Sequence, residues 1–244
     1  MEAQDRDAVV YPDSDGEPMA DNTLQFEWIV TLKENLDAVM PCFVGGDLLW
    51  YPVQGDPKER RAPDVLVALG RPKGHRGSYK QWEEGGESPD VVMEVLSPKN
   101  TLPEMIAKLR FYERHGAREF YVVDPDNELL QVWIRGDGDD LSLIETNGSF
   151  TSPALGITFV LKDGLSVRHA DGSPFLTFGQ LKAQRDTLAA ERDAAAAERD
   201  AAAAERDAAA AERDAAAAER DAAAAERERL ADRLRALGID PDEV

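Results

Sequence analysis

The feature that most limits how this chain can fold is a seven-residue repeat near its C-terminus. Residues 190–224 are five consecutive copies of Ala-Glu-Arg-Asp-Ala-Ala-Ala. Alanine has the highest helix propensity of the amino acids. The sequence therefore predicts one continuous helix over about 179–237, on the order of 90 Å long at about 1.5 Å per residue.

The strict period of seven favours a coiled coil. The register of the repeat weakens this prediction, because only the Ala194/Ala197 series is apolar at both core positions, and it places Glu198 and Asp200 beside the seam. Alanine also buries little area. Two readings stay open: a homo-oligomer formed through residues 181–237, and an exposed single helix that acts as a spacer.

The rest of the chain divides at composition changes. Residues 1–22 are polar and acidic and predict a flexible arm. Residues 23–178 have the apolar segments of a folded domain, and residues 179–244 hold the helix and a tail. The single cysteine, Cys42, excludes a disulfide framework and favours a cytoplasmic setting. No signal peptide or membrane span is expected.

The formal net charge is −20. Residues 1–180 hold 17 of the 28 basic and 31 of the 48 acidic residues, a net of −14. Such a charge opposes nonspecific binding to nucleic acid. A cation-filled site and a local basic loop can act against this background field.

The pattern of residues 23–178 predicts an α/β domain. Apolar residues at helical spacing indicate a helix over 23–39, and Thr101 and Gly116 are the expected boundaries of a second helix. That second helix lies between two apolar strands, and a strand–helix–strand unit over 90–124 predicts a right-handed crossover. We therefore expect a mixed, partly parallel sheet flanked by helices.

Two carboxylates lie within apolar strands. Asp64 begins the segment Asp-Val-Leu-Val-Ala-Leu, and Glu94 stands in the middle of Val-Val-Met-Glu-Val-Leu. Burying an unpaired charge costs several kcal/mol, about 2–7 for a polar group and more for an ion. A divalent cation such as Mg²⁺ or Mn²⁺, held between adjacent strands, would compensate both. The alternative is that both side chains face solvent at strand ends. Asp90 is about 13 Å from Glu94 along the strand, too far to share an ion.

Lys108 flanks the apolar stripe of the second helix, near Met105 and Tyr112. It has two readings. Its stem covers the core while its ammonium reaches solvent, or the helix packs over the Glu94 strand and directs the ammonium at a phosphate or a water.

One loop concentrates basic residues between the two carboxylate strands. It contains Arg71, Lys73, Arg76 and Lys80. Such a loop could contact phosphates near the site, or it is simply solvated.

Four motifs follow one another along the chain: Ala62–Val65, Ser88–Pro98, Lys108–Tyr112 and Gly116–Pro125. Together they resemble the Uma-two family of restriction endonucleases, which is placed in the PD-(D/E)XK nuclease superfamily. The resemblance covers roughly residues 20–165. It implies a restriction-endonuclease-like core and Mg²⁺-dependent cleavage of DNA.

The resemblance also implies roles for individual residues. Asp64 matches the motif aspartate and Glu94 the acidic residue of the (D/E)XK element. The position two after Glu94 is Leu96 rather than lysine. The resemblance implies that Lys108, on the following helix, replaces it.

Two hypotheses follow. In the first, the chain is a metal-dependent DNA endonuclease in which Asp64, Glu94 and the Val95 carbonyl hold Mg²⁺ (or Mn²⁺) and Lys108 orients or activates the water. In the second, the domain is a degenerate nuclease used for binding or assembly through the long helix. A Lys108 that faces away from the carboxylates would favour the second.

Overall fold

The computed structural model describes residues 9–238, so residues 1–8 of the expected arm and 239–244 of the expected tail lie outside the described part. The chain forms two compact units, Met1–Gln180 and Leu181–Val244. The helices are α1 (Thr23–Val39), α2 (Leu102–Arg114) and α3 (Phe178–Ala236). The strands are β1 (Phe43–Gly46), β2 (Trp50–Tyr51), β3 (Val65–Ala68), β4 (Tyr79–Lys80), β5 (Val91–Val95), β6 (Glu119–Asp124), β7 (Leu129–Arg135), β8 (Leu141–Ile144), β9 (Ser149–Thr151), β10 (Thr158–Val160) and β11 (Ser166–Arg168).

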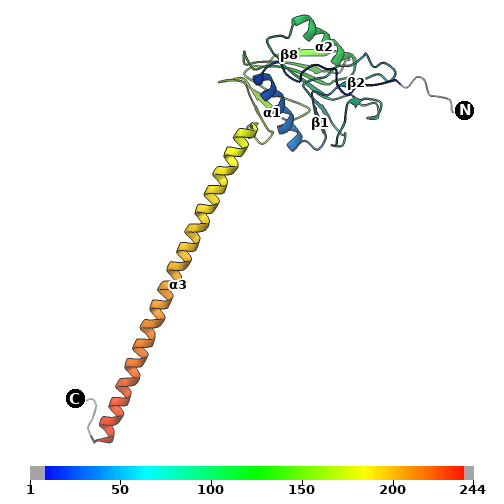
Figure 1. Ribbon diagram of the computed structural model, residues 1–244. Helices are drawn as coiled ribbons and strands as arrows, with labels where there is room; N and C mark the ends of the chain where they lie inside the picture. Colours follow the sequence, from blue (N-terminus) through cyan, green and yellow to red (C-terminus); the bar gives the residue numbers. More distant parts are fainter. Residues whose placement is uncertain (1–8, 239–244) are drawn as a thin grey trace, which may run out of the picture. The chain divides into compact units, whose positions relative to one another are not determined.

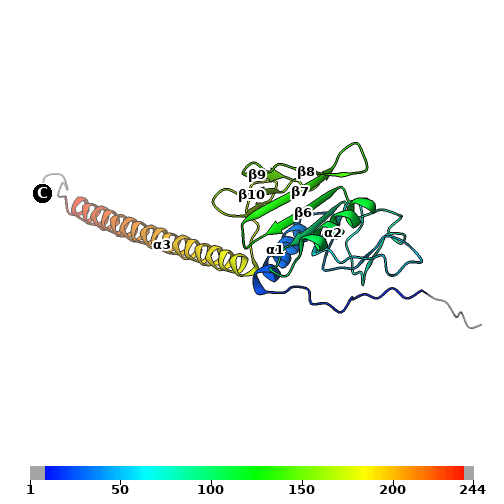
Figure 2. The same ribbon diagram turned by 90° about the horizontal axis from the view of Figure 1, so that it is seen from above.

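The main sheet has six strands in the order β1-β3-β5-β6-β7-β8. β5 and β6 are parallel and are joined by α2, whereas the other neighbours in this sheet are antiparallel. β6, β7 and β8 lie side by side in Figure 2. Smaller sheets pair β9, β10 and β11, and β2 with β4. The predicted α/β class, with a mixed sheet and a parallel crossover, is confirmed.

Helices α1 and α2 cover opposite faces of the sheet (Figure 1). Leu32 and Leu36 of α1 belong to a core that includes Val65 and Val67, whereas α2 packs in a second core that includes Leu66. Successive side chains of a strand point to opposite faces, so this alternation places one helix on each side. The central strands are consequently buried on both faces.

Helix α2 begins with a capping box. The Thr101 hydroxyl accepts from the Glu104 backbone N–H, and the Glu104 carboxylate accepts from the Thr101 N–H. These bonds satisfy two backbone donors that a helix N-terminus leaves unpaired. Gly116, with φ +99°, follows the helix and suits the turn toward β6. Both ends of the helix that carries Lys108 are therefore defined.

Residues 9–22, within the segment that the sequence predicts to be a flexible arm, form no helix or strand but contact the folded domain. The Tyr11 ring meets Tyr51 edge-on, with ring centroids 5.2 Å apart. Farther along, the Asp21 carboxylate accepts from Lys99 Nζ at 2.6 Å. The flexibility of this segment stays a prediction.

Helix α3 is continuous over 59 residues and buries none of them. This confirms the helix that the repeat predicts. Self-association through residues 181–237 stays a prediction. Within residues 9–238, no helix is both long and apolar enough to cross a membrane.

Candidate active site

Glu94 is a buried carboxylate on β5. Alternation along β5 places its side chain on the same face as Val92, toward α2. Only 2 % of Glu94 is exposed. Its Oε2 accepts from Lys108 Nζ at 2.7 Å, and its Oε1 accepts from the Tyr112 hydroxyl. Lys108 and Tyr112 are four residues apart and share one helix face, so α2 supplies both partners of this carboxylate.

Asp64 immediately precedes β3. In the antiparallel register of β3 and β5, Val65 faces Met93, so Asp64 lies at the level of Glu94. Residues opposite each other in such a pair have Cα atoms about 4.5–5.5 Å apart. The Asp64 Oδ2 accepts from the Val95 N–H at 2.6 Å. The sheet therefore brings together the two carboxylates that the sequence predicted to be neighbours.

The electrostatics of this pair are unfavourable without a further cation. Burial, and then the charge of Glu94, raise the pKa of Asp64 well above its usual range, against the Val95 N–H and Lys108, which lower it. Burial also raises the pKa of Glu94, although Lys108 and the Tyr112 hydroxyl oppose this. Two adjacent buried acids repel each other when both are ionised.

Lys108 keeps its positive charge in this environment. Burial opposes the charged form, but the charge and hydrogen bond of Glu94, with the charge of Asp64, raise the pKa of the ammonium. A lysine with a raised pKa remains protonated at neutral pH. Lys108 is therefore suited to stabilising or orienting negative charge, and unsuited to accepting a proton.

Val95 joins the two sides of the site through its backbone. Its N–H donates to Asp64, and its carbonyl oxygen accepts from Gln25 Nε2 of α1 at 2.8 Å. A carbonyl oxygen has a second lone pair that stays available to a ligand. Sequence analysis missed Gln25, because a glutamine on an amphipathic helix has no pattern that points to a site.

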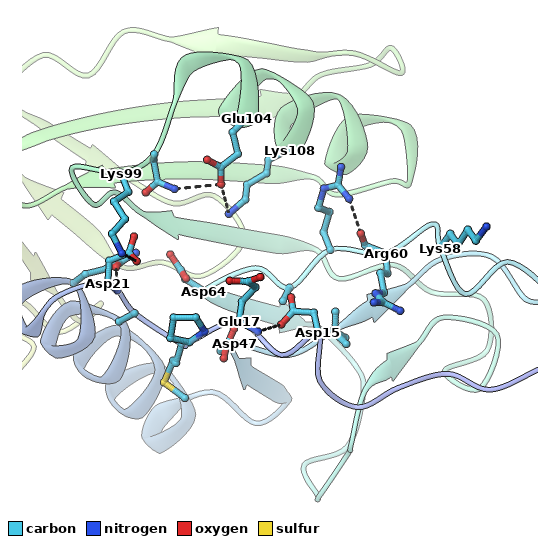
Figure 3. A pocket seen from close by; sticks show the side chains of 18 residues that line it. Asp15, Glu17, Asp21, Asp47, Lys58, Arg60, Asp64, Lys99, Glu104 and Lys108 are labelled. Carbon is cyan, nitrogen blue, oxygen red and sulfur yellow. Dashed lines mark hydrogen bonds and ion pairs between the residues drawn. The ribbon is translucent and has the colours of Figure 1, made fainter.

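A cavity of about 730 Å³ opens beside these residues. Figure 3 shows Glu104 and Lys108 of α2 on one side and Asp64, Asp47 and Glu17 across from them. The N-terminal segment contributes Asp15, Glu17 and Asp21 to the lining. Basic residues that line it are Lys58, Arg60, Arg61, Lys99 and Lys108. Asp64 and Lys108 therefore line a pocket that mixes both charges and opens to solvent, whereas Glu94 lies behind them, outside the lining.

Asp47 is a further acidic residue of this cavity that sequence analysis did not identify. It lies in the turn after β1, with φ 45°, and its N–H donates to the Asp64 carbonyl oxygen at 3.0 Å. Burial, and then Asp15, raise its pKa, against the charge of Lys108. The turn therefore adds negative charge near Asp64.

The loop that sequence analysis proposed for nucleic-acid contact lies elsewhere. None of its four basic residues lines the cavity, and each contacts an acidic residue nearby. The contacts are Arg71 Nη1 to the Glu84 carbonyl oxygen at 2.8 Å, Lys73 to Asp37 at 3.1 Å, Arg76 to Glu84 at 2.6 Å and Lys80 to Glu83 at 3.4 Å. Carboxylates compensate the charges of Lys73, Arg76 and Lys80, and contact of this loop with nucleic acid stays a prediction.

The donor set at Asp64 and Glu94 fits a divalent cation of the Mg²⁺ type. Mg²⁺ prefers oxygen ligands and commonly takes one or two carboxylates, completing its shell with water and substrate phosphate. Among residues 9–238, no group of three or more His, Cys, Asp and Glu side chains could hold a metal ion. The protein oxygens available to a cation here are those of the two carboxylates and the Val95 carbonyl.

Comparisons with known proteins identify a family for this chain. The family model Uma2, described as "Putative restriction endonuclease", matches residues 16–167, which include all three predicted catalytic residues. A solved structure from Anabaena variabilis ATCC 29413, titled a putative nuclease belonging to DUF820, shares 16% identity. It covers 54% of this chain and 70% of that chain with a TM-score of 0.37. No curated protein matches.

Proposed function

Because the chain belongs to the Uma2 family, we propose that it is a metal-dependent endonuclease that hydrolyses phosphodiester bonds of DNA. One observation carries this proposal: Lys108, which lines an open cavity together with Asp64, contacts the buried carboxylate of Glu94 at 2.7 Å. A buried acid pair with an adjacent cationic group is an arrangement suited to phosphoryl chemistry.

The proposed cofactor is Mg²⁺ or Mn²⁺, held by Asp64, Glu94 and the Val95 carbonyl. When bound, such an ion polarises the phosphodiester and lowers the pKa of a water molecule. The chain's residues supply the remaining work. Asp64 is oriented by the Val95 N–H, and Glu94 is oriented by Lys108 and Tyr112.

Lys108 donates one N–H to Glu94 and lies 3.9 Å from Glu104, and its ammonium has three N–H donors in all. It lines the cavity, so these donors can reach a phosphate oxygen or the attacking water. In the net reaction a water oxygen bonds to phosphorus, one P–O ester bond breaks, and the proton that the water loses is balanced by protonation of the leaving oxygen. The negative charge that grows on the phosphate is stabilised by the fixed ammonium of Lys108.

The alternative function, a degenerate nuclease that works only in binding or assembly, receives less support. It expects a Lys108 that faces away from the carboxylates. The observed contact with Glu94 is instead the one that the hydrolase reading requires. The absence of lysine at Leu96 is therefore a weaker argument against activity than it was from the sequence.

The test is an assay of plasmid nicking. The full chain is incubated with supercoiled DNA and Mg²⁺, Mn²⁺ or EDTA, and wild type is compared with Glu94→Gln. We expect metal-dependent nicking by wild type, and at least about 10²-fold less by the variant. Nicking that persists in EDTA, or that the variant retains in full, would argue against the proposal.

A further inference from the structure

Four cations near the candidate site have no acidic partner. Lys58, Arg60 and Arg61 belong to the loop between β2 and β3, and Arg110 belongs to α2. None of the four forms an ion pair with any acidic residue of the part of the chain described, 9–238. In a domain with excess acid, leaving four neighbouring cations uncompensated favours binding of an anion.

The loop that carries three of them is fixed against α2. Glu59 contacts His115 Nε2 at 2.7 Å and Arg114 at 3.4 Å. The Arg61 guanidinium lies 5.5 Å from the centroid of the Phe111 ring, and its backbone pairs with Trp50. These contacts pre-organise the loop, so less conformational entropy is lost when it binds a ligand.

Arg61 connects two hollows of the surface. It lines the cavity that contains Asp64 and Lys108, and it also lines a second hollow of about 320 Å³. Arg110 and Arg114 line the second hollow as well, and Glu59 is its only acidic lining residue among those described. A path of basic residues therefore leads from the candidate active site over Arg61 onto α2.

The chemistry of the path identifies the kind of ligand. Guanidinium groups bind phosphates through paired N–H donors, and a nucleic-acid strand presents one negative charge at each nucleotide. We propose that Arg61 and Arg110 bind phosphates of the DNA strand that extends from the scissile position, with Lys58 and Arg60 adding charge at the cavity rim. This inference rests on the proposed function, since the strand is the substrate of that same site.

The experiment measures binding separately from cleavage. All chains carry Asp64→Asn, which retains an acceptor for the Val95 N–H and prevents turnover. Arg61→Gln and Arg110→Gln are made singly and together in this background. The matched control is Lys73→Gln with Lys80→Gln, which changes the net charge by the same amount as the double variant but lies away from both hollows. The probe is a short fluorescein-labelled DNA duplex in EDTA, followed by fluorescence anisotropy over a salt series.

We expect each arginine substitution to weaken binding roughly tenfold. The slope of log K against log salt should fall by about 0.9 for each lost phosphate contact. The control should keep the slope of the parent chain. Equal effects in the control and in the double variant, or no binding of the duplex by the parent chain at low salt, would overturn the inference.

Failure of the proposed function gives a different result. If native Asp64 chain cleaves no DNA with any metal while the arginine-dependent salt slope is observed, the binding path stands and the hydrolase proposal falls. If the native chain cleaves and the arginine variants bind as the parent does, the binding path falls alone.

Discussion

Lys108 Nζ lies 2.7 Å from Glu94 Oε2, although the two residues belong to different elements and Glu94 is almost completely buried. The position two residues after Glu94 is Leu96, and we propose that Lys108 takes the place of a lysine there. The ion pair joins α2 to β5, and Lys108 lines the cavity. Its structural effect and its proposed catalytic effect can each be measured.

Substituting Lys108 by methionine should reduce both activity and stability. Loss of one fixed charge donor is expected to lower kcat by about 10²–10³-fold. Removing one partner of a buried pair lowers the free energy of unfolding by about 3–5 kcal/mol. Lys33→Met is the control, since Lys33 pairs with Asp37 and does not line the cavity. Unchanged cleavage in Lys108→Met would contradict the assigned role.

The stability loss in Lys108→Met should depend on pH. Without the ammonium, the pKa of Glu94, already raised by burial, rises further in the folded state. The unfolded chain has a glutamate pKa of about 4.3. When the folded-state pKa of an acid lies above its unfolded value, the free energy of unfolding falls as pH rises from the unfolded pKa to the folded one. Urea unfolding at pH 5 and pH 8 measures the difference, which should be larger at pH 8.

Mg²⁺ should stabilise the native chain more at pH 8 than at pH 5. The pKa values of Asp64 and Glu94 are raised in the folded protein, so without metal this pair stabilises the fold less as pH rises above the unfolded values. Metal binding needs deprotonated ligands. At a free concentration about 100 times Kd, it adds about 2.7 kcal/mol to the free energy of unfolding. An equal shift in Asp64→Asn would show that the ion binds elsewhere.

Tyr112→Phe should move the acidic limb of the activity profile to higher pH. The Tyr112 hydroxyl donates to Glu94 and lowers the pKa of that carboxyl, so its loss lets the pKa rise. The profile of kcat/KM against pH measures the shift. Tyr121→Phe is a matched control, because Tyr121 donates to another buried carboxylate, Glu119, at 2.6 Å. An equal shift of the acidic limb of the pH profile in both variants would show that the shift does not come from the hydrogen bond between Tyr112 and Glu94.

The acidic N-terminal segment should weaken DNA binding. Asp15 and Glu17 line the cavity that the scissile phosphate must enter. Asp15→Asn with Glu17→Gln should tighten binding about two- to fivefold at low salt, and less at high salt because exposed charges are screened. Asp126→Asn with Glu145→Gln removes the same charge from exposed positions outside the cavity. A matching gain in that control would assign the effect to net charge alone.

Sequence reasoning located the central elements because their signals are local. Apolar β-branched runs define β3 and β5, and Thr101 with Gly116 brackets α2. The same runs showed that Asp64 and Glu94 are strand carboxylates. Asp64 and Glu94 lie close together because their two strands pair, and the apolar pattern of these strands favours that pairing.

The remaining site residues depend on tertiary contacts. The sequence pattern places Tyr112 on the apolar face of α2, and its ring stacks on that of Trp50. The pattern does not show that its hydroxyl donates to Glu94. Gln25 and Asp47 come from segments far from β5 in the sequence. The ion pairs of Lys73, Arg76 and Lys80 also depend on tertiary or loop geometry that the composition of the loop at 71–80 does not show.

The role of Asp64 in metal-dependent hydrolysis is best measured by the Mg²⁺-dependent rate of plasmid cleavage in two matched carboxylate variants. Asp64→Asn removes a charge from the proposed metal site. Asp90→Asn removes the same charge from a carboxylate that accepts the Leu69 N–H and pairs with Arg118 outside the cavity. We predict that Asp64→Asn lowers the rate by at least about 10²-fold and that Asp90→Asn cleaves within about threefold of wild type. Equal rates in the two variants would contradict the account.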